Sequence, residues 1–249
     1  PGSSSFSGFV QPTGPPMLKK PATLIALAIG ALAPSFAHAD QAFPATLAGH
    51  ALLPAQTFLA PPKDAPASLA VSGKYTAADA RRVDAVGSLP GHSYLSDKAA
   101  PRPTKVALPF KGQPVQGFSG IKHSGEGRYW VLQDNGYGAR SNSADAMLMF
   151  HRVKPDWKKG GVKLEHSTFI HDPDGKVPFP IVNEGTRKRY LTGADFDIES
   201  IQPIGDALWF GDELGPYLLK TDRQGKVLAV FETRVDGKVL KSPDHFSVT

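Results

Sequence analysis

Acidic residues that could bind a metal ion gather in three short segments in the second half of the chain. In GADFDIES, Asp195, Asp197 and Glu199 occupy alternate positions. Alternate side chains of a β-strand share one face, so this spacing predicts three carboxylates side by side. Such carboxylates repel one another unless a cation or solvent separates them. The pattern therefore predicts a site for a hard cation such as calcium, which takes roughly six to eight oxygen ligands.

Two further segments offer oxygen ligands at the ends of expected strands. QDNGYG contains Asp134 and Asn135, and GDELG contains Asp212 and Glu213. A role in a turn or on the surface is the alternative for each of these residues taken alone. Because the segments recur at equivalent places in a repeat, we predict that they share a calcium site. The predicted metal ligands are Asp134, Asn135, Asp197, Glu199 and Asp212.

The sequence gives less support to other kinds of metal or catalytic site. HDPDGK, at residues 171–176, resembles the start of a calcium loop but lacks the glycine at the sixth position and the distant glutamate. A β-turn is the better interpretation. No G-x-S-x-G segment is present, and Ser119 in GFSGI is interpreted as a tight-packing position. The histidines follow no H-x-x-x-H spacing, which argues against a zinc site.

The elements that must position these residues are short strands. From Lys105 onward, runs rich in Val, Ile, Leu, Phe, Tyr and Trp alternate with Gly, Asp and Asn, and no helical periodicity of ten or more residues is present. This alternation of short apolar runs with turn-forming residues predicts an all-β domain over residues 104–249. The expected strands are residues 105–110, 117–123, 128–133, 147–153, 163–170, 198–203, 207–211, 217–221 and 227–233.

A sequence repeat indicates the architecture. The segment FSGIKHSGEGRYWVLQDNGYG can be laid over IESIQPIGDALWFGDELGPYL, which places Trp130 on Trp209 and Asp134 on Asp212. The second copy continues through YLLKTD and VLAVFET, giving four antiparallel strands in about 36 residues. That is the size of one β-propeller blade. We predict a propeller rather than a β-sandwich, because strands in a sandwich repeat less regularly.

A propeller is stable because each blade packs against its neighbours and the last blade meets the first. After residue 103 the sequence has room for about three blades, and it ends at DHFSVT in a polar stretch with no closing strand. We therefore expect this chain to hold an incomplete, N-terminal part of a propeller, truncated at the C-terminus.

The N-terminal region has the order of a cleavable secretory signal. Lys19 and Lys20 follow Met17, a short apolar run comes next, and small residues flank His38. The apolar run is too short to span a membrane. We predict a signal peptide over residues 17–39, cleavage after Ala39, and a periplasmic or secreted location.

The segments around this signal are interpreted separately. Residues 1–16 carry no charge and no periodicity, and are interpreted as sequence upstream of the true start or as residues added by cloning, so the fold is predicted without them. Residues 40–103 are rich in Pro and Ala and are predicted to form an extended or partly helical leader. Within this leader, AADARRVDAV at residues 77–86 is the one helical candidate.

The composition excludes several classes of protein. Removing residues 1–39 would take Lys19 and Lys20 from the 28 basic residues and none of the 23 acidic ones, which leaves a net charge of about +3. This charge is too weak and too scattered to indicate nucleic-acid binding. The chain has no cysteine, so disulfides and thiolate metal sites are excluded. We expect a monomer without a membrane span after signal cleavage.

Several motifs, in the same order, resemble a known family of secreted phytase-like propellers, described as "esterase-like activity of phytase". They are GFSGI, DNGYG, HDPDGKVPF, DIES and ALWFGDELGPYLLKTDRQGKVL, which together span roughly residues 110–231. The family's later blades, including a further strand that bears a glutamate, have no counterpart in this sequence.

The resemblance implies a calcium-dependent hydrolase of phosphoric or other esters that acts from the propeller channel. Glu199 and Glu213 are the expected catalytic residues, either of which could act as general base if it is not itself a metal ligand. Two alternatives stay open, because fold does not determine function. One is a non-catalytic propeller that binds a partner and holds a structural calcium ion, and the other is a lactonase-type hydrolase.

Overall fold

The structure is a computed structural model that describes residues 44–75, 92–95 and 102–248. The chain divides into two units, residues 1–46 and residues 47–249. Of the first unit, residues 44–46 are described, and they belong to no helix or strand. The predicted signal peptide and the helical candidate at residues 77–86 lie outside the described residues.

The described residues of the second unit form strands and two short 3-10 helices joined by loops, which confirms the predicted all-β class. The strands are β1 (Phe58–Leu59), β2 (Val71–Ser72), β3 (His92–Leu95), β4 (Arg102–Ala107), β5 (Phe110–Lys111), β6 (Gln113–Pro114), β7 (Phe118–Gly125), β8 (Arg128–Gln133), β9 (Met149–Asp156), β10 (Gly161–Phe169), β11 (Ile198–Ile204), β12 (Ala207–Asp212), β13 (Tyr217–Asp222), β14 (Val227–Glu232), β15 (Arg234–Val235) and β16 (Lys238–Val239). The 3-10 helices are η1 (Ala67–Ala70) and η2 (Arg140–Asn142).

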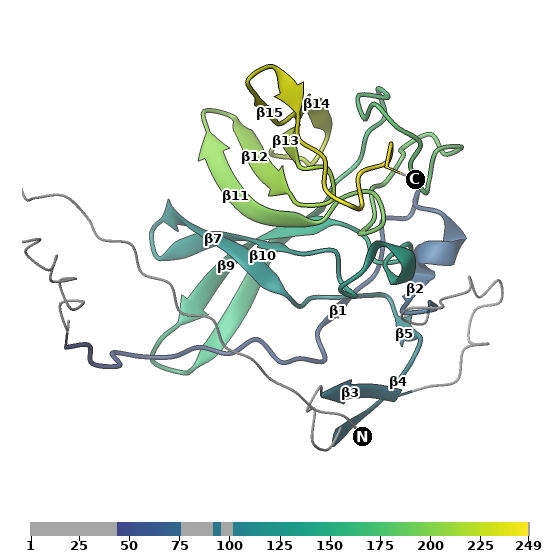
Figure 1. Ribbon diagram of the computed structural model, residues 1–249. Coiled ribbons are helices and arrows are strands. Elements are labelled where there is room, and N and C mark those ends of the chain that lie inside the picture. Colours follow the sequence, from purple (N-terminus) through teal and green to yellow (C-terminus); the bar gives the residue numbers. More distant parts are fainter. Residues whose placement is uncertain (1–43, 76–91, 96–101, 249) are drawn as a thin grey trace, which may run out of the picture. The chain divides into compact units, whose positions relative to one another are not determined.

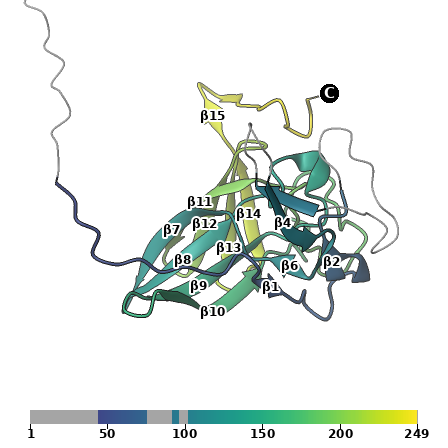
Figure 2. The ribbon, with the colours of Figure 1, turned by 90° about the horizontal axis from the view of Figure 1, so that it is seen from below.

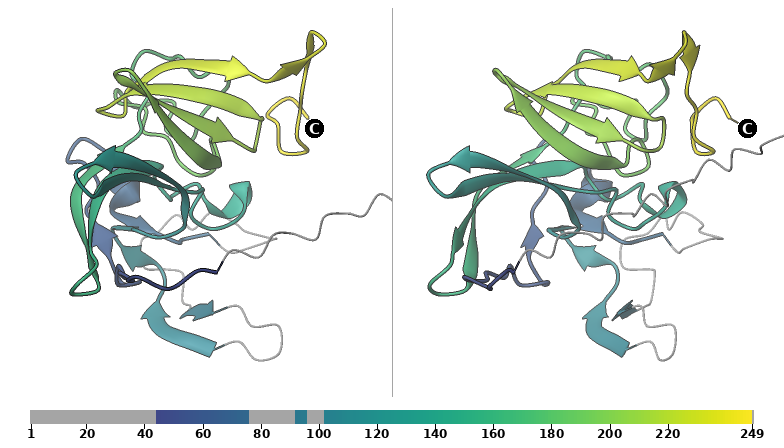
Figure 3. Two further views of the ribbon diagram at one scale, coloured as in Figure 1. Left: turned by 90° about the vertical axis from the view of Figure 1, so that its left-hand side faces the viewer. Right: turned by 60° about the vertical axis from the view of Figure 1, so that its left-hand side comes forward.

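Two four-stranded antiparallel sheets dominate this unit. The first sheet has the strand order β10-β9-β8-β7, and the second has the order β11-β12-β13-β14. Both are meanders in which each strand pairs with the next one along the chain, as the repeat predicts. Figure 1 shows the second sheet stacked on the first, and Figure 2 shows β7 to β10 side by side. The two views of Figure 3 show the same stacking.

Turn residues fix the pairing of neighbouring strands. Glu126 and Gly127, between β7 and β8, both have positive φ angles, 52° and 68°. Two residues of positive φ form the tight hairpin turn whose twist matches the strands that it joins. Between β11 and β12, Gly205 has a φ of 57° in a loop of two residues. Gly127 and Gly205 thus lie in the gaps between the strands that the sequence predicted.

The core lies between the two sheets. In β12, Leu208 and Phe210 are fully buried, whereas Trp209 between them faces the opposite side. The rings of Phe150 and Phe210, one from each sheet, lie 5.6 Å apart. β7 and β11 approach closely at Gly120, where a Cβ atom would lie 3.2 Å from Ile201. Burial of these apolar faces is the main force that holds the sheets together.

The described part of the leader forms two short strands that pair with strands at the start of the domain. β1 pairs with β6, with Phe58 opposite Pro114, and β2 pairs with β5, with Val71 opposite Lys111. These leader residues are extended in the structure. The paired partners at residues 110–114 were not predicted, because two-residue ladders leave no period in the sequence.

Two blade-sized sheets fit a propeller-like arrangement, and the described residues form no closed ring of blades. Within the same residues, no helix is both long and apolar enough to cross a membrane.

Candidate metal centre

The loops that follow β8 and β12 meet the start of β11, and this contact builds the candidate site. The segment that leads into β11 passes so close to the loop after β8 that a Cβ atom on Gly193 would lie 1.9 Å from the carbonyl oxygen of Asn135. The backbone N–H of Gly193 also donates to Ala146 (2.9 Å). Only a residue without a side chain fits here. Gly193 therefore allows Asp197 to reach Asn135.

Asp197 is the most constrained carboxylate of the site. Its side chain accepts two hydrogen bonds from Asn135, at Oδ1 from the backbone N–H (3.0 Å) and at Oδ2 from the side-chain amide (2.7 Å). Its own N–H donates to Oδ1 of Asp212 (2.7 Å), and its carbonyl accepts from the N–H of Glu213 (3.0 Å). Asp197 is only 7% exposed. Asn135 therefore orients the carboxylate of Asp197, while Asp212 and Glu213 fix its backbone.

Two glutamates complete a cluster around Asp197. Carboxylate oxygens of Asp197, Glu199 and Glu213 all lie within 4.8 Å of one another. Both glutamates are more exposed than Asp197, so the cluster opens to solvent on their side. Among the described residues, no basic side chain forms an ion pair with any of the three.

The electrostatics of the cluster oppose its full ionisation. Burial first, and the negative charges of Glu199, Glu213 and Asp134 second, raise the pKa of Asp197 to about 7, against the opposing effect of the hydrogen bond from the backbone of Asn135. A carboxylate whose pKa is raised in this way costs free energy when it is ionised at neutral pH. A bound cation would remove that cost.

The prediction that three acids share one face of a strand is wrong for Asp195. β11 begins only at Ile198, and Asp195 lies in the turn before it. Its carboxylate accepts hydrogen bonds from the N–H groups of Val182 (2.8 Å) and Thr192 (2.7 Å), so it stabilises this turn. Burial raises the pKa of Asp195 to about 6.

Asn135 and Asp212, both predicted as metal ligands, use their side chains to position the site. The amide of Asn135 donates to Asp197, and its Oδ1 accepts from the N–H of Gly138 (2.8 Å). In Asp212, Oδ1 accepts from Asp197 and Oδ2 accepts from the N–H groups of Gly215 (2.8 Å) and Tyr217. Burial raises the pKa of Asp212 to about 6. Both side-chain heteroatoms of Asn135 and both carboxylate oxygens of Asp212 thus have a hydrogen-bond partner within the protein.

Asp134 lies at the edge of the cluster. Its Oδ1 accepts from the N–H of Gly136 (2.8 Å), and its negative charge contributes to the raised pKa of Asp197. Burial also raises the pKa of Asp134 itself. Asp134 thus lies near enough to Asp197 for its charge to act on that carboxylate. The carboxylates that lie closest together are those of Asp197, Glu199 and Glu213.

The HDPDGK segment forms a turn, as the sequence predicted. The N–H of Gly175 donates to the carbonyl of Asp172 (3.2 Å). The Asp172 carboxylate is fully buried and accepts from the N–H groups of Lys176 (2.7 Å) and Val177 (3.0 Å). Asp174 is exposed and pairs with Lys226 (2.7 Å). The two aspartates therefore bind protein groups rather than form a calcium loop.

One buried polar group was not anticipated from the sequence. His151 is fully buried in β9, with Nδ1 2.8 Å from the hydroxyl of Ser167, and burial lowers its pKa to about 4. The two strands carry several other polar residues, so no pattern in the sequence singled out this pair. In the described residues, no histidine joins the metal-binding cluster.

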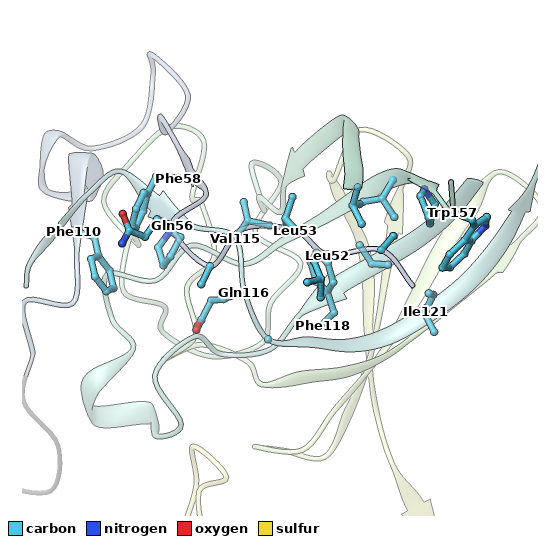
Figure 4. Close-up of a pocket in the computed structure, with 18 residues that line it drawn as sticks. Leu52, Leu53, Gln56, Phe58, Phe110, Val115, Gln116, Phe118, Ile121 and Trp157 are labelled. Atoms are coloured by element: carbon cyan, nitrogen blue, oxygen red, sulfur yellow. The ribbon is translucent and has the colours of Figure 1, made fainter. Parts of the chain in front are cut away.

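An apolar cavity of about 640 Å³ lies apart from the carboxylates. It occupies the face of the first sheet that points away from the second sheet, because Val131 lines it while its strand neighbours Trp130 and Leu132 belong to the core. Figure 4 shows Leu52, Phe118 and Trp157 along this cavity. None of the predicted metal ligands lines it.

Comparison with known proteins identifies the family. Residues 113–246, more than half of the chain, match the family described as "Phytase-like: Esterase-like activity of phytase". The chain belongs to this phytase-like family. No match was found among curated proteins or among solved structures. All three clustered carboxylates of this phytase-like chain lie within the matched residues, and the family description indicates a hydrolase-like function.

Proposed function

We propose that this phytase-like protein is an exported, calcium-dependent hydrolase of phosphoric or other esters, and that it acts at Asp197, Glu199 and Glu213. The observation that carries the proposal is the convergence of their oxygens within 4.8 Å, without a basic partner among the described residues. The family description supplies the class of reaction.

The residues present fit a hard divalent cation. Calcium prefers oxygen ligands, and the cluster offers three carboxylates and no nitrogen or sulfur ligand. The raised pKa of Asp197 supports the same conclusion, because neighbouring like charges that lack a counter-ion favour binding of a cation. Asp197 and Glu199 are the proposed ligands.

The calcium ion and the other residues of the site have separate proposed roles in the reaction. When bound, calcium would polarise an oxygen of the substrate and lower the pKa of a water molecule. Glu213, on the loop after β12, is the proposed general base that takes a proton from the attacking water. Asn135 is a positioning residue, because its two hydrogen bonds fix the carboxylate of Asp197. Asp212 fixes the backbone of the same residue.

An activity panel tests this proposal. We expect hydrolysis of at least one phosphomonoester, phosphodiester or lactone, abolished by a chelator and restored by calcium. Glu213→Gln should reduce kcat by about 100-fold or more, the contribution typical of a general base. Asp174→Asn is the matched control, since Asp174 is an exposed acid that pairs with Lys226.

The outcomes of the panel separate the alternatives. Turnover of lactones alone would favour the lactonase-type reaction. Calcium binding without turnover of any substrate would contradict the hydrolase and favour a non-catalytic binding module.

Export is a separate proposal that rests on the order of residues 17–39. We expect the mature protein to begin at or near Asp40. N-terminal sequencing checks this expectation. Cytoplasmic protein with an intact Met17 terminus would contradict it.

A further inference from the structure

The segment after β16 folds back onto the loop that carries Glu213. It comprises residues 240–248, which Figure 3 shows in yellow beside the end of the second sheet. The N–H of Ser242 donates to the carbonyl of Gly215 (3.0 Å), and the hydroxyl of Ser242 donates to the carbonyl of Leu214. These two carbonyls directly follow Glu213 in the chain. We call residues 240–248 the strap, because they bind across this loop.

Two side-chain contacts also anchor the strap. Nη1 of Arg140, in η2, donates to the carbonyl of Asp244 (3.0 Å). The hydroxyl of Tyr217, the first residue of β13, lies 2.9 Å from Nε2 of His245. His245 is only 3% exposed, although most of the strap is exposed. The imidazole of His245 is therefore the buried anchor of the strap.

The hydrogen bonds of His245 require its neutral form. The backbone N–H of Ser247 donates to Nδ1 of His245 (3.1 Å), and a backbone N–H cannot accept. Nδ1 therefore carries no hydrogen, and Nε2–H donates to the hydroxyl of Tyr217. Protonation of Nδ1 would set two N–H groups against each other, break this bond and bury a charge. The hydroxyl of Ser247, 2.9 Å from Nδ1, can turn to accept from a protonated ring, but the N–H cannot.

The surroundings of His245 oppose its protonation. Burial lowers the pKa of His245 below its usual value, and the cations Lys241 and Arg140 lower it further, against Glu232, which raises it. Tyr217 stays neutral, because its own pKa is raised to about 12. Neutral His245 thus favours the attached strap, and protonated His245 opposes it.

Two more acids lie near this part of the strap. Asp195 and Asp244 line a small gap beside Arg140 and Tyr217. The carboxylate of Asp195 accepts hydrogen bonds outside the strap, and Asp244 is exposed. Neither acid forms an ion pair with a histidine of the described residues. Burial raises the pKa of Asp195 to about 6, so its protonation strengthens the fold as the pH falls, the opposite sign to that of a buried histidine.

We propose that the strap is a pH-dependent device, which holds the loop after Glu213 while His245 is neutral and detaches when His245 is protonated. A detached histidine has the ordinary pKa of about 6.5, so attachment is strongest above this pH and weakens as the pH falls through it. Detachment frees the loop of the proposed general base. That consequence for catalysis rests on the proposed function, whereas the detachment itself does not.

Amide hydrogen exchange, followed by NMR on the full chain without substrate, tests the strap. The reporter is the amide of Ser242, which is bonded to Gly215, and its protection is corrected for the intrinsic exchange rate at each pH. We expect this protection to fall by up to about tenfold between pH 7.5 and pH 5.5, because the detached state gains a proton that the attached state excludes. The amide of Leu219, in the buried part of β13, reports global unfolding and should not fall.

Two variants make the test specific. His245→Asn keeps a side-chain oxygen that accepts the N–H of Ser247 but does not titrate, so the fall in protection should disappear. His166→Asn alters an exposed histidine of β10 and should keep the wild-type fall. A wild-type fall below twofold, or an equal fall in His245→Asn, would overturn the proposal.

The wild type alone keeps the proposal falsifiable if His245→Asn does not fold. Protection of Ser242 that falls together with that of Leu219 would mark global unfolding and would overturn the strap. Since no substrate is present, the result is independent of the proposed hydrolase. A fall in protection in a protein that hydrolyses nothing would support the strap and contradict only the proposed function.

Discussion

Replacing Glu213 by Gln should stabilise the metal-free protein at pH 8, although it alters a residue of the proposed active site. Asp197 has a pKa of about 7 in the folded protein, because of burial first and of neighbouring carboxylates second. An unfolded aspartate has a pKa of about 3.9, so the difference is about three units. Ionised Asp197 therefore costs the folded state up to about 4 kcal/mol at pH 8.

Glu213 accounts for a minor share of that cost. Burial is the largest contribution, and the remainder is divided among Glu199, Glu213 and Asp134. Solvent around the exposed Glu213 screens its charge further. We therefore expect Glu213→Gln to recover about 0.5–1 kcal/mol at pH 8, which raises Tm by about 1–4 °C for a protein of this size.

The pH dependence has a definite sign. Between about pH 4 and pH 7 the folded protein keeps a proton on Asp197 that the unfolded chain has lost, so stability falls as the pH rises through this range and levels off above it. Glu213→Gln should make this fall shallower and should have little effect at pH 4.5.

Urea denaturation with chelator at pH 4.5, 6 and 8 measures the effect. Asp206→Asn is the control, since Asp206 is an exposed acid in the turn between β11 and β12. A Glu213→Gln variant that is less stable than the wild type at pH 8, or a difference that is equal at pH 4.5 and pH 8, would refute this reasoning.

Three further variants test the architecture of the site by urea denaturation. Asn135→Ala should destabilise the protein by about 1–3 kcal/mol, because Asp197 loses its amide donor and the N–H of Gly138 loses its acceptor; unchanged stability would show that these bonds contribute nothing. Gly193→Ala should cost more than about 3 kcal/mol, since its Cβ would overlap the backbone of Asn135; a fully stable variant would contradict the close approach. Phe150→Ala should cost about 3–5 kcal/mol, because Phe150 is fully buried between the two sheets; a loss below about 1 kcal/mol would contradict that packing.

The sequence predicted the strands of the two sheets well for a physical reason. Alternating burial, as in Leu208, Trp209 and Phe210, is imposed by each strand's own pleat and is therefore visible in a single sequence. The signal for the turns is equally local, because positive φ angles favour residues such as Gly127 and Gly205. The short ladders of β1 with β6 and of β2 with β5 join distant segments and left no such signal.

The site was predicted only in part, because it depends on contacts between distant segments. Alternation suggested that Asp195 would join Asp197, but the strand begins after both residues. The hydrogen-bond partners that occupy Asn135 and Asp212 come from backbone groups of other loops, which no sequence pattern reveals.

Calcium-dependent melting tests the central claim most directly. The melting temperature of the wild type should rise with calcium, by about 2.7 kcal/mol of added stability when the free ion is a hundredfold above its dissociation constant. Asp197→Asn and Glu199→Gln should lose most of this gain, and Asp174→Asn should keep it. A wild type whose melting temperature does not respond to calcium, or an Asp197→Asn variant that responds equally, would contradict the metal centre.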